Sequence, residues 1–123
     1  MPYHLTREST HLRLVFFDDM TSQDLRSLGH AIGALEDAAA VSLNRLTDLS
    51  QISWAAATYA DMLDFAERRK AQRLANPVKS AIVAPRPVQV GFARMFQMLM
   101  NHPQIEVQLF ETLEEAEACL TGV

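Results

Sequence analysis

The stretch Leu46-Thr47-Asp48-Leu49-Ser50-Gln51-Ile52-Ser53 indicates the fold more clearly than any other part of the chain. It predicts an apolar strand that ends in a polar turn, followed by an amphipathic helix that begins near Trp54. In an open α/β sheet, ligands bind at junctions between the end of a strand and the next helix. We therefore predict an α/β fold with a candidate site close to this junction.

Apolar periodicity along the rest of the chain alternates between strand-like and helix-like patterns. The predicted strands cover residues 3–5, 12–17, 41–46, 78–84 and 105–109, the last of them at or near a sheet edge. Two predicted helices cover residues 53–74 and 88–100, and two others follow capping boxes that begin at Thr21 and Thr112. This order predicts a single domain over residues 1–123, with a mostly parallel, mixed sheet of about five strands, an N-terminal hairpin and about four helices.

Composition limits the classes of partner and the compartment. The net charge of -4 and the pI near 5.5 argue against nonspecific binding to nucleic acid. The single cysteine, Cys119, cannot form an internal disulfide, which is typical of a reduced, cytoplasmic protein. No apolar run approaches the roughly 20 residues that a transmembrane segment needs. We therefore expect a soluble protein of the cytoplasm.

The order and length of the predicted elements, together with Asp48-Leu49-Ser50, resemble the SpoIIAA-like fold of the STAS superfamily, named for sulfate transporters and anti-sigma-factor antagonists. In antagonist members, a similar strand end is followed by Asp-Ser-Ser-Gly at the start of a helix, where a partner kinase phosphorylates a serine. Laid onto this chain without gaps, that motif falls on Ala56-Ala57-Thr58-Tyr59, so only Thr58 retains a hydroxyl. The chain is therefore similar to the divergent SpoIIAA-like branch without that serine, whose members resemble CRAL-TRIO lipid-transfer domains in fold. This resemblance implies a small apolar or lipid-like ligand and a dimer.

The leading hypothesis is a non-enzymatic binding module for a small apolar or amphiphilic ligand. The candidate wall residues are Trp54, Phe92, Met95 and Phe96, and the candidate ligands of a polar head group are Ser53, Thr58 and Arg86. Packing of two helices on the sheet explains each apolar residue better than a ligand pocket does when the residue is considered alone, because apolar stripes at helical spacing normally form the core.

The alternative hypothesis is a protein-interaction module related to anti-sigma-factor antagonists, with a regulatory protein as partner. Its candidate residues for interaction or phosphorylation are Asp48, Ser50 and Thr58. Helix capping gives a simpler role for the hydroxyls near the junction, because Ser50 or Ser53 could accept hydrogen bonds from the first backbone N–H groups of the helix.

Two further patterns bear on the surface. In the predicted helix 88–100, Val90, Met98 and Met100 lie off the main apolar stripe, so we expect a ligand or a second copy in a homodimer to cover them. The basic run Glu67-Arg68-Arg69-Lys70 is typical of a solvated helix face whose charge complements the helix dipole.

The sequence predicts no catalytic site. The four histidines are scattered and show no metal-ligand spacing, and no histidine, nucleophile and acid occur in a defensible order. No glycine-rich phosphate loop is present, so we expect no nucleotide, no other cofactor and no metal.

Overall fold

The computed structural model describes residues 3–55, 58–100 and 102–121, with the side chains of residues 18–19 and 53–55 left out of the description. Its strands are β1 (Tyr3–Arg7), β2 (His11–Met20), β3 (Asn44–Ala55), β4 (Val78–Val83) and β5 (Ile105–Phe110). Its helices are α1 (Ser22–Ala38), α2 (Tyr59–Ala71), α3 (Pro87–Leu99) and α4 (Leu113–Thr121). Among these residues, no helix combines the length and the apolar character needed to cross a bilayer.

The five strands form one sheet in the order β1-β2-β3-β4-β5. The β1–β2 hairpin is antiparallel, and every other pair of neighbouring strands is parallel. This arrangement confirms the predicted α/β fold with a mixed sheet, an N-terminal hairpin and an edge position for the last strand.

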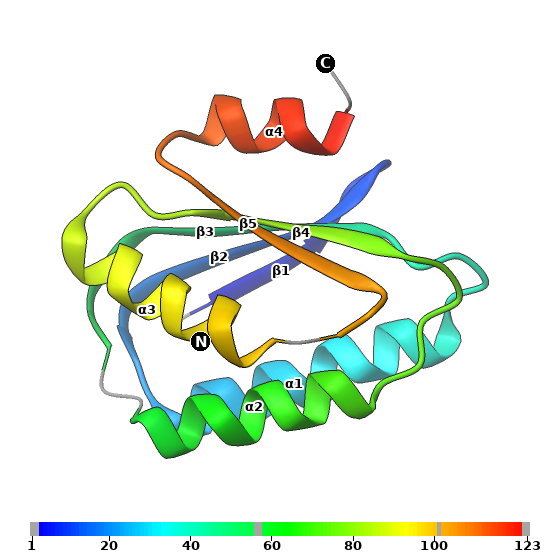
Figure 1. Cartoon of the computed structure of the whole chain (residues 1–123), viewed down its shortest axis with the longest axis horizontal. Helices are drawn as coiled ribbons and strands as arrows, with labels where there is room; N and C mark the ends of the chain where they lie inside the picture. The colour runs from blue at the N-terminus through cyan, green and yellow to red at the C-terminus, as the bar shows by residue number, and fades with distance from the viewer. Residues whose placement is uncertain (1–2, 56–57, 101, 122–123) are drawn as a thin grey trace.

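The helices cover the two faces of the sheet unequally. Helices α1, α2 and α3 lie on one face, and α4 lies on the other, where it packs on β3, β4 and β5 (Figure 1). The larger core lies under α1, α2 and α3 and includes Leu14, Phe16, Leu28, Leu49 and Ile82. A smaller cluster under α4 is centred on Leu46, Ala81, Val83 and Ala116. The sheet therefore has a thick, three-helix side in which an internal site can form.

The predicted boundaries of the third strand and the second helix are wrong. β3 begins at Asn44 rather than Val41 and continues through the expected polar turn to Ala55, because the long strand β2 supplies pairing partners as far as Met20. The pairing of β2 with β3 contains two register shifts, each with one extra residue on β3. The helix then begins at Tyr59, where Thr58 and Asp61 form a capping box, instead of at Ser53. The stretch of residues 46–53 thus identifies the correct fold, but it lies inside β3 and not at the junction of a strand with a helix.

The end of α2 also differs from the prediction, which placed it at Leu74. The helix ends at Ala71, and the chain then turns toward the segment before β5. There the backbone N–H and C=O groups of Leu74 both bond to the side-chain amide of Gln104, at 3.2 Å and 3.0 Å. A helix that continued to Leu74 would lose these two bonds.

Candidate functional site

A cavity of about 60 Å³ lies between the sheet and helices α1, α2 and α3. Its lining comes from β2, β3 and β4 together with residues of all three helices, and it extends to Met100 and Ile105. The lining is apolar apart from Arg45, Thr47 and Arg69. The cavity is therefore apolar over most of its surface and carries charge where Arg45 and Arg69 line it.

Strand alternation explains how β3 places polar groups in this cavity. Successive side chains of a strand point to opposite faces, so Arg45, Thr47 and Leu49 all face the three-helix side. Leu46, between them, belongs to the cluster under α4. The guanidinium of Arg45 thus enters the thick side of the molecule from the centre of the sheet.

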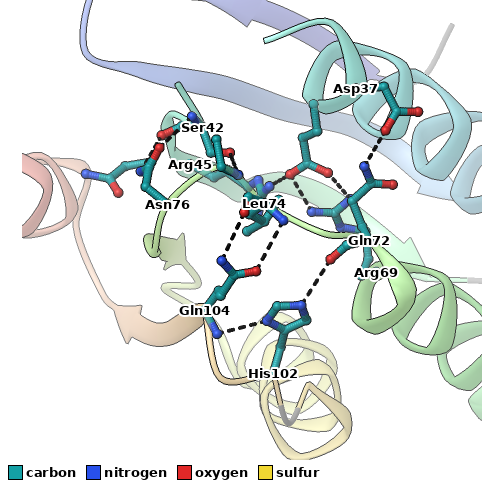
Figure 2. Close-up of polar contacts among 12 residues, drawn as sticks. Asp37, Ser42, Arg45, Arg69, Gln72, Leu74, Asn76, His102 and Gln104 are labelled. Carbon is teal, nitrogen blue, oxygen red and sulfur yellow. Dashed lines mark hydrogen bonds and ion pairs between the residues drawn. The ribbon is translucent and has the colours of Figure 1, made fainter. Parts of the chain in front are cut away.

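Arg45 and Arg69 share the carboxylate of Glu36. Arg69 Nη1 and Nη2 donate to Glu36 Oε1 and Oε2 at 2.6 Å and 2.8 Å. Arg45 Nη2 forms a second ion pair with Glu36 Oε2. The side chains of Glu36, Arg69 and Arg45 are only 3%, 4% and 10% exposed, so the whole cluster is removed from bulk water. Figure 2 shows Arg45 and Arg69 of this cluster side by side, Arg45 from β3 and Arg69 from α2.

The charges of this cluster do not balance. Burial lowers the pKa of Arg69 to about 10, and burial together with repulsion from Arg69 lowers the pKa of Arg45 to about 9. Both values lie above neutral pH, so two cations face one carboxylate. Arg45 Nε is also buried and has no hydrogen-bond partner among the described residues. The cluster therefore retains positive charge and a free donor beside the apolar cavity.

Hydrogen bonds next to the cluster tie together the segments that hold it. Gln72 Nε2 donates to Asp37 Oδ1 at 2.7 Å, which joins the ends of α2 and α1. His102 Nε2 lies 3.1 Å from the backbone oxygen of Gln72, and Gln104 N donates to His102 Nδ1 at 2.9 Å (Figure 2). These contacts fix the ends of α1 and α2 and the segment before β5 relative to one another.

The structure brings two of the predicted wall residues to this cavity. Phe92 and Phe96 of α3 line it, with Ala93 between them. Met95 lies half-buried on the same helix but outside the lining. The side chains of Trp54 and Ser53 lie outside the described residues.

The predicted head-group ligands Thr58 and Arg86 lie elsewhere, and both serve helix starts. The Thr58 hydroxyl accepts from Asp61 N at 3.3 Å and donates to Asp61 Oδ2 at 3.0 Å. Hydrogen bonds from Ser22 and Thr58 lower the pKa of Asp61 below its usual value. Arg86 precedes α3 and donates through Nη2 to the backbone oxygens of Ser50 and Ile52 at 3.0 Å and 3.3 Å.

Asp48 and Ser50 lie inside β3 rather than at its end, so the prediction that Ser50 or Ser53 caps the next helix is wrong. Asp48 is buried, and its Oδ1 accepts from the backbone N–H of Ser50 at 2.9 Å. Ser50 is half-buried, and its backbone oxygen accepts from Arg86.

The two surface patterns need correction. Met100 is buried and Val90 is half-buried against the main core, whereas Met98 is 83% exposed. The protein's own core therefore covers Val90 and Met100, two of the three side chains that we expected a ligand or a second copy to cover. In the basic run, Arg69 is buried in the ion-pair cluster instead of lying on a solvated face.

Glu36 and Arg45 are site residues that the sequence pattern does not predict, although it contains a signal for them. Glu36 continues the buried helical stripe of Leu25, Leu28 and Ile32, whereas its apolar neighbour Leu35 is 38% exposed. A charged residue at a buried position of a helix or strand needs a buried partner of opposite charge, and this requirement favours a pair between Glu36 and Arg45.

Solved structures resemble this chain over nearly its whole length. An uncharacterised protein of the DUF3478 family with a SpoIIAA-like fold, from Shewanella loihica PV-4, matches 96% of this chain and 91% of its own, with a TM-score of 0.64 and 15% identity. The chain has the SpoIIAA-like fold. The anti-sigma-factor antagonist SpoIIAA in its unphosphorylated form matches with a TM-score of 0.62, 13% identity and coverage of 98% and 99%. An anti-sigma-factor antagonist from Mycobacterium paratuberculosis matches with a TM-score of 0.61, 13% identity and coverage of 97% and 92%.

The SpoIIAA-like fold confirms the resemblance drawn from element order. No family model and no curated protein matches the sequence. Of the antagonist motif laid onto the chain, Ala56 and Ala57 lie outside the described residues, whereas Thr58 is the N-cap of α2. The neighbours therefore identify the architecture, and the cavity with its arginines is the feature that this chain's own residues supply.

Proposed function

We propose that this protein is a non-enzymatic binding module whose small apolar or lipid-like ligand occupies the cavity beneath α1, α2 and α3. The observation that carries the proposal is the cavity itself, which is apolar over most of its surface. Protein interiors are normally packed as densely as organic crystals, so an unfilled volume among large side chains favours an occupant.

The location of the cavity supports the same proposal. It lies among elements that are distant in sequence, and Phe92 and Phe96 are the two aromatic residues that α3 contributes to it. Both are only half-buried. A ligand between α3 and the sheet would bury more of their surface, and each Å² of apolar surface so removed from water is worth about 25 cal/mol.

Native mass spectrometry of the purified protein, followed by denaturing release, tests this proposal. We expect a discrete apolar adduct on the wild-type protein. Ala93 lines the cavity and is buried, so Ala93→Val would fill part of the space. Overpacking costs about 1–3 kcal/mol, which predicts that A93V holds the adduct roughly tenfold more weakly.

Ala34→Val on the exposed side of α1 is the matched control, because it adds the same two carbons away from the cavity. It should keep the adduct. Equal occupancy of A93V and A34V would place the ligand elsewhere, and a wild-type protein without any adduct would contradict the proposal.

The same measurement reports the mass of the assembly, which we propose to be a homodimer acting in the cytoplasm. Met98 and Val88 of α3 are 83% and 55% exposed, and a second copy that packs on α3 would cover them. A monomeric mass at micromolar concentration would contradict the dimer.

A second candidate function is a protein-interaction module that binds a regulatory partner through the start of α2. Two solved neighbours of the same fold are anti-sigma-factor antagonists. Next to Thr58 on this helix, Tyr59 and Leu63 are 58% and 36% exposed. A photo-crosslinking amino acid at Tyr59 should capture one defined protein in cells, whereas the same amino acid at exposed Glu106 should not. Equal labelling from both positions would contradict this function.

A further inference from the structure

The ion-pair cluster of Glu36, Arg45 and Arg69 lacks one negative charge. Both arginines pair with Glu36, and no second carboxylate pairs with either of them among the described residues. The next carboxylate along α1, Asp37, is exposed and bonds to Gln72 instead. A buried cation without a full counter-charge is strongly destabilising, so this cluster favours the entry of an anion.

Arg45 is the group that is free to receive that anion. Its residue is only 8% exposed and lines the cavity, and its Nε has no hydrogen-bond partner among the described residues. Arg69, in contrast, already uses Nη1 and Nη2 on both oxygens of Glu36. An anion in the cavity would therefore accept from Arg45.

The cavity restricts the kind of anion. A guanidinium donates well to a planar carboxylate, and the mostly apolar lining accepts an alkyl chain while offering few donors, beyond those of Arg45, Thr47 and Arg69, to the several oxygens of a phosphate. A volume of about 60 Å³ holds roughly four to six water-sized atoms at about 10–15 Å³ each. Acetate, propionate and butyrate fall within that range.

Building on the proposed function, we infer that the ligand of this cavity is a short-chain monocarboxylate whose carboxylate binds Arg45 and whose alkyl chain contacts the apolar lining. The ligand then supplies the missing negative charge of the Glu36–Arg45–Arg69 cluster. It also fills the space between α3 and the sheet.

Titration of the wild-type protein at neutral pH, followed in two-dimensional amide NMR spectra, tests this inference. The probes are acetate, propionate and butyrate, with butyramide as the uncharged analogue of butyrate and octanoate as a test of length. We expect butyrate to bind at least about tenfold more tightly than butyramide, because a hydrogen bond to a charged group is the stronger kind. Octanoate should bind more weakly than butyrate, since it exceeds the cavity.

Arg45→Met supplies a second measurement, because methionine keeps an unbranched side chain that fills most of the space of the arginine stem and removes the charge. Without Arg45, the Glu36 carboxylate still accepts both hydrogen bonds from Arg69, so R45M leaves no unpaired buried charge and should fold. R45M should lose the preference for butyrate over butyramide, whereas Arg94→Met on the exposed side of α3 should retain it. The comparison of butyrate with butyramide on the wild-type protein is decisive even if R45M fails to fold.

Each contrary outcome has a separate meaning. Equal binding of butyrate and butyramide would contradict the inference that a carboxylate binds Arg45, but it would remain consistent with an apolar binding module. Tighter binding of octanoate than of butyrate would contradict the inference that the ligand has a short alkyl chain. If no probe binds while native mass spectrometry finds an adduct, the carboxylate inference fails alone; if there is no adduct either, the proposed function fails with it.

Discussion

Replacing Glu36 with glutamine is expected to lower the free energy of unfolding by about 3–5 kcal/mol, since removal of one partner from a buried ion pair leaves an uncompensated buried charge. Here the loss affects two arginines at once, because Arg45 and Arg69 both depend on that carboxylate. Urea denaturation at neutral pH, followed by circular dichroism, measures the change. The substitution preserves the shape of the side chain, so the effect reports charge rather than packing.

The control for this variant is Glu67→Gln on α2. Glu67 also forms an ion pair, with Lys70 at 2.8 Å, but its side chain is 59% exposed. Exposed pairs contribute about 0–1 kcal/mol, so E67Q should unfold close to the wild-type midpoint. If E36Q were as stable as E67Q, the description of Glu36 as the shared partner of two buried cations would be wrong.

Phe65→Ala is expected to cost about 3–5 kcal/mol, the usual range for removal of a buried aromatic ring. The ring of Phe65 packs against that of Phe96 with centroids 5.7 Å apart. On its other side lies α1, where a Cβ added at Gly29 would stand 3.6 Å from Phe65 Cδ2. The ring therefore holds α1, α2 and α3 together over the cavity, and its loss would weaken all three contacts. Thermal and urea unfolding of F65A measure the change.

Tyr59→Ala is the matched control, because it removes an aromatic ring from the same helix at a position that is 58% exposed. Surface substitutions of this kind usually change stability by no more than about 0.5 kcal/mol. An F65A protein as stable as Y59A would mean that the three helices do not depend on this ring.

The hairpin, the sequence of strands and helices and the first capping box could all be predicted, because each follows from periodicity or from residues three apart. Thr21 and Asp24 form that capping box as expected. The same pattern occurs at Thr58 and Asp61, but Ser53 is also a residue type that favours an N-cap and Trp54 begins an apolar stretch, so the local sequence favours an earlier start. A helix that begins at Ser53 starts too early and ends β3 too soon.

The ion-pair cluster could not be assembled from local patterns. Glu36, Arg45 and Arg69 come from a helix, a strand and a second helix, and their pairing depends on how α1 and α2 dock on the sheet. The run of charged residues Glu67-Arg68-Arg69-Lys70 predicts that Arg69 lies on a solvated helix face like its neighbours. The side of the sheet that receives α1 and α2, and therefore the partner that Arg45 meets there, is a property of the tertiary structure rather than of the strand pattern.

The sheet has its strands side by side in the same order in which the ribosome synthesises them. Each new strand can therefore pair at once with the one made before it, and the sheet can grow from one edge while translation continues. The cavity lining, however, runs from Leu14 to Ile105. A nascent chain can build most of its sheet early, but it can enclose a ligand only after the last strand has emerged.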